Sequence, residues 1–313
     1  MKKNFINKVH VEGLLYQHNL KKKVTGENAQ NPGTEYITGT VEIATDNDIL
    51  NIVSVFYAFV TAKTKNGKDN SAFKVLSDII DGKLGSVMAN GADAAVKLAI
   101  DSAIGLNDFY TDRSGKEELV SAKRNEGGFI SIINELNPDE KLRSTFATDM
   151  VITSVTHKDA DEEKQLPEKA VIRGVIFNYN KAILPVEFSA INPNAIAYFE
   201  GLDISPKNPC FTEVRGRQIS ETIVKSITEE SAFGEPSVKE VKNSHKDFVI
   251  TWARPEIYEW DSEETITAAE LSEAKAARET YLATIKQKND EYKASKAAQP
   301  AAFAPATNAG FEF

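Results

Sequence analysis

The sequence has very little cysteine, with Cys210 the single one among 313 residues. A lone cysteine forms neither an intramolecular disulfide nor a thiolate cluster, which argues against a small secreted scaffold and a structural zinc site. Long apolar runs are missing too, and His10 and Glu12 interrupt the basic N-terminus before a signal-peptide core forms. We therefore expect a protein of the reducing cytoplasm with no membrane contact.

The motifs of common enzyme classes are also missing. The four histidines are scattered and lack the spacing of a metal site, and residues 82–86 lack the spacing of a phosphate-binding loop. Acidic pairs such as Asp46 and Asp48 fall in stretches typical of turns, where solvated carboxylates are common. We expect no metal, no cofactor and no enzymatic activity, and an enzyme with an unrecognised site is the least favoured alternative.

The composition that is present indicates a folded chain with unevenly distributed charge. Apolar residues make up 41% and charged residues 27%, which is ordinary for globular proteins. The net charge is −9, yet residues 1–25 hold six lysines against Glu12 alone, and residues 255–313 hold eleven acidic against six basic residues. This balance argues against a surface coated with nucleic acid and leaves room for a local basic groove.

Alternation of apolar and polar residues predicts three strands in the first half of the chain, at residues 9–20, 36–44 and 49–62. Gly13 lies inside the first run and indicates a bulge or sharp bend. A short helix is predicted at residues 71–80, with Asn70 or Ser71 as N-cap and Gly82 after its end. Two more strands follow at residues 96–110 and 118–133.

The second half of the chain repeats this order with a different sequence. Strands are predicted at residues 146–156, 171–179 and 183–191, then a helix opened by Asn192 and Pro193 that ends at about residue 202. The last two strands are predicted at residues 211–227 and 248–258, joined by a polar loop at 229–246. The repeated order weighs more than any single motif.

Three strands, a helix and two strands is the connectivity of the OB-fold, a five-stranded Greek-key barrel. We predict a mainly β chain with two tandem OB-like five-stranded barrels at residues 1–140 and 141–260. A long helix at 265–298 and a disordered tail at 299–313 follow. A β-sandwich with incidental helices is the alternative. The long helix has a thin apolar stripe, so it either docks on the barrels or pairs with a second copy.

An OB barrel binds single strands on its second and third strands and in two of its loops, where rings stack on bases and cations contact phosphates. Such residues in the first unit are Tyr16, His18, Lys21, Lys22, Lys23, Tyr57, Lys63, Lys65, Phe109, Tyr110, Arg113, Lys123 and Arg124. Those in the second unit are Arg173, Phe177, Tyr179, Arg215, Arg217, Trp252 and Arg254.

Each group of candidate binding residues has a structural alternative. Aromatic residues on strands are common in β cores, and alternation does not tell which face is inside. As an isolated signal, the three lysines at residues 21–23 are more typical of a solvated loop than of a binding site. Arg215 and Arg217 share one face of a strand, where an ion pair with Glu213 on an exposed face is an equal alternative.

The arrangement resembles a phage-type single-stranded DNA-binding protein, most of all in residues 103–110, 127–130 and 211–219. The resemblance implies a non-enzymatic protein that coats and protects unwound DNA in replication or recombination. It also implies a C-terminal end that docks replication or recombination proteins, formed here by Phe311, Glu312 and Phe313. The alternative class is a β-rich virion or tail assembly protein that oligomerises through its C-terminal helix.

Overall fold

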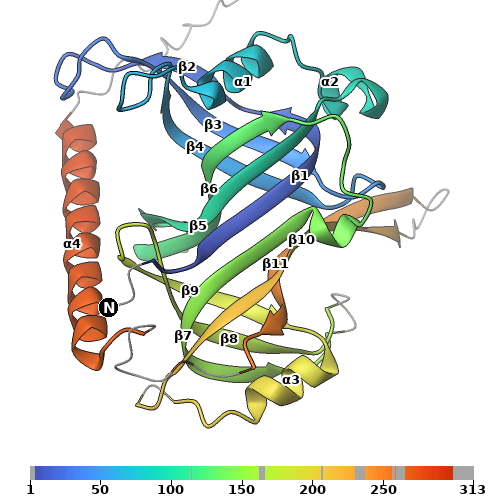
Figure 1. Cartoon of the computed structure of the whole chain (residues 1–313), viewed down its shortest axis with the longest axis vertical. Coiled ribbons are helices and arrows are strands. Elements are labelled where there is room, and N and C mark those ends of the chain that lie inside the picture. The colour runs from blue at the N-terminus through green and yellow to red at the C-terminus, as the bar shows by residue number, and fades with distance from the viewer. Residues whose placement is uncertain are drawn as a thin grey trace, which may run out of the picture.

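The computed structural model describes residues 4–113, 115–161, 166–205, 207–229, 237–255, 258 and 265–298. Within these ranges the strands form one 11-stranded sheet. Figure 1 shows the sheet curling into two units, one above the other, with one long helix beside both.

The first closed ring of strands contains β1 (Asn7–His18), β3 (Glu35–Ala44), β4 (Ile52–Thr61), β5 (Lys97–Thr111) and β6 (Glu118–Ile132). The order around the ring is β1-β5-β6-β4-β3, and β3 pairs back to β1. The β4–β6 pairing is parallel and the others are antiparallel. The third strand thus closes the barrel against the fifth.

The second closed ring contains β7 (Ser144–Lys158), β8 (Lys169–Phe177), β9 (Ile183–Ala190), β10 (Cys210–Glu229) and β11 (Ser237–Ala253). It has the same pairing scheme, with β10 pairing back to β7 and with β9 parallel to β11. The predicted mainly β, OB-like fold is confirmed, because both halves close with the connectivity of a five-stranded Greek-key barrel.

The two rings are joined by antiparallel pairing of β1 with β7, from Asn7 opposite Thr148 to Val11 opposite Ser144. Beyond that stretch β1 turns to pair with β3. The predicted bend at Gly13 lies at this point, where a Cβ atom would lie 2.0 Å from the carbonyl oxygen of Ala44. Only glycine allows the two backbones to approach so closely.

Short helices lie between the third and fourth strands of each ring, as predicted: α1 (Ser71–Ile80) and α3 (Pro193–Glu200). The side chains of Asn70 and Asn192 cap them by accepting hydrogen bonds from Ala72 N and Asn194 N. A short helix α2 (Val87–Asn90) and two 3₁₀ turns, η1 (Ala92–Ala94) and η2 (Glu140–Leu142), complete the connections.

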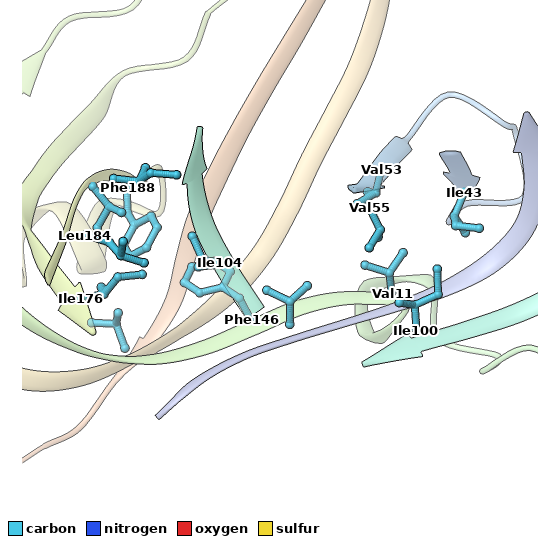
Figure 2. Packing of buried hydrophobic residues seen from close by; sticks show 14 of the residues in the cluster. Val11, Ile43, Val53, Val55, Ile100, Ile104, Phe146, Ile176, Leu184 and Phe188 are labelled. Carbon is cyan, nitrogen blue, oxygen red and sulfur yellow. The ribbon is translucent and has the colours of Figure 1, made fainter. Parts of the chain in front are cut away.

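One hydrophobic cluster continues from the first ring into the second. Figure 2 shows Val11, Ile43, Val53, Val55 and Ile100 on one side, Ile176, Leu184 and Phe188 on the other, and Ile104 and Phe146 between them. The predicted division into units at residues 140 and 141 stays a prediction, since the core does not stop there.

A second cluster lies on the outside of the second ring. Phe5 stacks on Phe177 with ring centroids 3.9 Å apart, and Tyr258 packs 4.9 Å from Phe211. Leu271, in the first turn of α4 (Ala268–Ala298), joins the same cluster. The chain's N-terminal segment and its C-terminal segment therefore cover one apolar surface together.

Helix α4 docks on its own chain and reaches from the second ring to the β5–β6 hairpin of the first (Figure 1). Arg278 Nη2 lies 2.5 Å from Asp108 Oδ1, and these side chains are only 10% and 1% exposed. Farther along, Lys286 and Lys293 both bind Glu117 at 2.8 Å, and their hydrogen bonds lower the pKa of Glu117 to about 2. Of the two predicted roles for the thin apolar stripe of this helix, the structure has docking on the barrels of the same chain.

Two segments differ from the predicted loops. Residues 21–24 form the edge strand β2 (Lys21–Val24), which pairs with β3. The predicted loop at 229–246 is wrong over most of its length, because β10 and β11 stay paired from Val214 opposite Ala253 to Glu229 opposite Ser237. The paired ends of β10 and β11 form a two-stranded ribbon, which extends out of the second ring close to where the two rings meet (Figure 1). The predicted tail at 299–313 lies outside the described residues.

A histidine links β7 to α3 and gives a pH-dependent contact. His157 Nδ1 lies 2.7 Å from Glu200 Oε1, and this hydrogen bond raises the pKa of His157 above its usual value. Because the pKa is higher in the folded state, the protonated His157 stabilises the fold at pH values below its unfolded pKa, and this contribution is lost as the pH rises through the folded-state pKa.

We expect Glu200→Gln to lower the His157 pKa in an NMR titration of the ring protons. An unchanged pKa would contradict the contact.

Candidate nucleic-acid interface

A cleft of about 1460 Å³ lies where the two rings meet. Its lining comes from β1, β5 and β6 of the first ring and from β7, β10 and β11 of the second, with the η2 segment between the rings and the turn at residues 178–180 between β8 and β9. The paired segments of β1 and β7 both contribute, so the cleft exists because the rings are joined edge to edge.

Three exposed aromatic side chains line the cleft. Phe129 on β6 is 80% exposed, Tyr179 in the β8–β9 turn is fully exposed, and Trp252 on β11 is 40% exposed. Phe129 faces outward because the pleat of β6 turns its neighbour Ile130 into the core. Exposed rings that gather on one surface are the stacking platforms that single-stranded nucleic acids use.

The Trp252 ring is covered by an arginine from the neighbouring strand. The guanidinium carbon of Arg215 lies 4.4 Å from the ring centroid, and Arg215 Nε donates to Glu213 Oε1 at 2.6 Å. Arg215 pairs with Trp252 across the strands, but Gly216 then pairs with Ile250, a one-residue shift. Such a bulge re-aims side chains, and it lies beside the cation–π pair.

Gly216 is fixed by sterics, which gives a testable substitution. A Cβ atom there would lie 2.0 Å from the Val249 carbonyl oxygen and 2.7 Å from the Phe146 ring. We expect Gly216→Ala to lower the free energy of unfolding by about 1–3 kcal/mol, measured by urea denaturation. Gly26→Ala is the control, because nothing lies within 4 Å of that position. Equal stability of the two variants would contradict the packing.

The charges in the cleft have both signs. Basic residues lining it are Lys8, Lys141, Arg215 and Arg217. Acidic residues lining it are Asp101, Glu126 and Asp139. His10 Nδ1 lies 2.8 Å from Asp101 Oδ1, so this carboxylate has a local partner. Arginines placed next to an exposed indole suit contact with phosphates on either side of a stacked base.

A second hollow of about 670 Å³ continues from the cleft and shares Arg217, Thr251 and Trp252 with it. It runs to the start of α3 and includes Tyr198 and Arg254. The Arg254 guanidinium carbon lies 4.4 Å from the ring centroid of Tyr258, outside this hollow. Trp252 therefore lies where the cleft and the second hollow join into one continuous surface.

The described part of the chain contains no group of three or more His, Cys, Asp or Glu side chains placed to share a metal ion. Among its helices, none has both the length and the apolar character needed to cross a bilayer.

A family model described as YorF matches residues 6–288. The chain belongs to the YorF family. No curated protein matches the sequence. Among solved structures, the chain is similar to a deletion mutant of the single-stranded DNA binding protein from Thermus aquaticus, with a TM-score of 0.42 and 11% identity. That match covers 83% of this chain and 98% of the other.

The structure brings four of the sequence-predicted residues together in the cleft: Tyr179, Arg215, Arg217 and Trp252. A fifth, Arg254, lines the adjoining hollow. All come from the second ring, in which the predicted Arg215 and Arg217 share the face opposite Gly216. Their part in binding stays a prediction.

The predicted residues at the start of the first ring lie around β2 and α1, outside the lining of the cleft and of the adjoining hollow. Lys22 pairs with Asp81 at 2.9 Å and Lys63 with Asp69 at 2.5 Å. Burial lowers the pKa of His18, which favours its neutral form. The remaining members of this group are Tyr16, Lys21, Lys23 and Lys65.

The predicted loop residues Phe109, Tyr110 and Arg113 lie at the far end of the β5–β6 hairpin, next to α4. Lys286 of the helix lies 5.5 Å from the Tyr110 ring centroid. Helix α4 thus lies beside the loop between the fourth and fifth strands, with which an OB barrel commonly binds a nucleic-acid strand.

Three predicted binding residues are corrected by their burial. Tyr57 is 2% exposed and Phe177 is fully buried, so neither ring has a face on which a base can stack. Lys123 reaches from β6 into the second ring, where its Nζ donates to the Glu187 carbonyl oxygen and lies 5.0 Å from the Phe248 ring. Burial lowers the pKa of the Lys123 ammonium. It links the rings instead of facing a phosphate.

Two further predicted arginines have partners on the protein surface. Arg173 Nε donates to Glu187 Oε2 at 2.8 Å on the second ring. Arg124 pairs with Glu126 at 3.1 Å, and its guanidinium carbon lies 4.3 Å from the Phe56 ring centroid. Neither lines the cleft.

Sequence reasoning missed Phe129, Lys8 and Lys141 as lining residues. The signal for Phe129 was present, because Gly127 and Gly128 precede a ring that alternates with apolar Ile130. The lysines carry no such signal, since their place in the cleft depends on the pairing of β1 with β7.

Proposed function

We propose that the chain binds single-stranded DNA in the cleft between the rings and across the adjoining hollow, largely without sequence preference. The observation that carries the proposal is the exposed Trp252 ring under Arg215, with Phe129 and Tyr179 exposed on the same cleft. Every base offers a π-face, so stacking on such rings tolerates any sequence.

The energetics suit this mode of binding on an acidic chain. Stacking supplies about 1–3 kcal/mol per base, so three rings supply about 3–9 kcal/mol, against about 8 kcal/mol for a micromolar affinity, before any ion pair is counted. The four basic side chains of the cleft then contact phosphates locally, and the net charge of −9 elsewhere does not prevent this.

The biological setting is part of the proposal. By its resemblance to phage-type proteins, the chain coats and protects unwound DNA during phage-type replication or recombination. Phe311, Glu312 and Phe313 lie outside the described residues, so their docking of replication or recombination proteins stays a prediction.

The assembly-protein alternative depends on α4 pairing with another copy. In the structure the inner face of α4 is used within the chain, through Leu271 in the second cluster and Arg278 on Asp108. This observation favours a helix that packs against its own chain over one that pairs with a second copy.

A titration of the full chain with fluorescein-labelled oligo-dT, followed by anisotropy, tests the proposal. We expect saturable binding at low salt, weakened by salt with a slope of about −0.7 per phosphate contact, hence about −3 for four cations. Light scattering is run in parallel. Absence of binding at low salt, together with large DNA-independent oligomers that are lost when residues 268–298 are deleted, would favour the assembly alternative.

A further inference from the structure

A separate hollow of about 500 Å³ lies between β4 and β6 of the first ring and the base of the β10–β11 ribbon. This hollow shares no lining residue with the cleft. Two of its lining residues, Asn125 and Gln218, are sequence neighbours of the cleft residues Glu126 and Arg217. Its volume falls within the range of about 300–1,000 Å³ typical of small-ligand sites.

Two buried amide side chains in its wall have atoms without a hydrogen-bond partner. Asn125 and Gln218 are 4% and 5% exposed. Asn125 Nδ2 donates to the Ser54 carbonyl oxygen at 3.0 Å and to Gln218 Oε1 at 2.7 Å. Asn125 Oδ1 and Gln218 Nε2 have no partner in the described structure. Buried polar groups nearly always have a hydrogen-bond partner, so the acceptor Asn125 Oδ1 and the donor Gln218 Nε2 are the two atoms that a ligand would pair with.

Other lining residues suit a flat ring with an attached phosphate, and the one carboxylate among the described residues that line the hollow, Asp247, pairs with Lys169 at 2.6 Å. Phe56 and Phe248 supply apolar walls, and the Arg124 guanidinium lies 4.3 Å from the Phe56 centroid. Arginine planes stack on nucleobases. Lys246 is exposed and lines the same hollow, where it can meet an anionic group.

We propose that this hollow is a second site, independent of the cleft, which holds one nucleobase. The exocyclic amine of the base donates to Asn125 Oδ1, a ring nitrogen accepts from Gln218 Nε2, and the phosphate lies toward Arg124 and Lys246. A single asparagine or glutamine amide reads adenine with the same pair of groups, a carbonyl oxygen and an N–H, which here come from two residues; cytosine also carries an amine beside a ring acceptor. Thymine lacks the amine and fits less well.

Access to the two amide atoms requires a side chain of the rim to move, because both atoms are shielded from solvent. Arg124 is the candidate, since its partners Glu126 and Asn107 are themselves surface residues. The base arrives either as a free nucleotide or as one base of a bound strand, and the chemistry of recognition is the same.

The test is an NMR titration of the full chain with dAMP, following the backbone amides of Asn125 and Gln218. We expect saturable shifts, binding of dTMP weaker by about tenfold, and no shift at these amides with deoxyribose 5-phosphate. Shifts with oligo-dA but not dAMP identify a strand as the source of the base. Gln218→Leu removes the dAMP response, and Gln218→Glu, which keeps the shape, does the same if the leucine variant fails to fold.

Trp252→Ala separates this site from the cleft. We expect that variant to lose oligo-dT affinity and keep the dAMP shifts, so either proposal can fail alone. Absence of saturable shifts at these amides with dAMP, dCMP and oligo-dA alike would overturn the site. Equal shifts with deoxyribose 5-phosphate, or an unchanged dAMP response in both Gln218 variants, would overturn it too.

Discussion

Replacing Trp252 by alanine is expected to weaken binding of oligo-dT about 5-fold to about 150-fold. The substitution removes the ring at the junction of the two hollows and leaves Arg215 without its cation–π partner. Loss of one stacked base costs about 1–3 kcal/mol, which gives this range of dissociation constants. Fluorescence anisotropy at low salt measures the change.

Phe59→Ala is the matched control for Trp252→Ala. Phe59 is also an exposed strand aromatic, at 54%, but it lies on β4, packs 4.4 Å from Tyr36, and does not line the cleft. We expect less than a threefold change. If Phe59→Ala weakened binding as much as Trp252→Ala, the interface would lie on the outer face of the first ring instead.

Arg278→Ala is expected to lower the free energy of unfolding by about 3–5 kcal/mol, measured by guanidinium denaturation. The Asp108 side chain is 1% exposed and accepts two hydrogen bonds from Arg278, so removal of the arginine leaves a buried carboxylate that has, among the described residues, only the Ser121 hydroxyl as a hydrogen-bond donor and no opposite charge. Breaking a buried pair costs far more than the pair contributes when both partners are present.

Two further variants test the α4 anchor. Lys293→Ala breaks an exposed pair with Glu117 and should change stability by less than about 1 kcal/mol. Combining Asp108→Asn with Arg278→Met removes both charges and should recover part of the loss. Stability of Arg278→Ala within about 1 kcal/mol of the parent would mean that α4 is not anchored there.

Much of the fold follows from local pattern. Alternation places the strands of both rings, and the caps Asn70 and Asn192 place α1 and α3, because these signals depend on neighbouring residues. The sequence pattern predicts loops where the structure has the strand β2 and the first part of β11, residues 237–246. They are polar, and their pairing depends on backbone hydrogen bonds, which leave no apolar alternation in the sequence.

The candidate site was only partly predictable. Parity placed Arg215 and Arg217 on one face, but it did not distinguish the buried Tyr57 from the exposed Phe59 two residues later on the same strand. Which face of a strand meets the core is decided by ring closure. The cleft arises from the pairing of β1 with β7, more than a hundred residues apart, and no local pattern encodes it.

Photocrosslinking of the full chain to oligo-dT that contains 5-iodo-deoxyuridine tests the cleft most directly, with crosslinked peptides located by mass spectrometry. Crosslinks at Trp252, Tyr179 or Phe129 are expected, and they should be lost when unlabelled oligo-dT competes. Crosslinks confined to peptides around residues 21–24 or 109–113, with none in the cleft, would contradict binding between the rings.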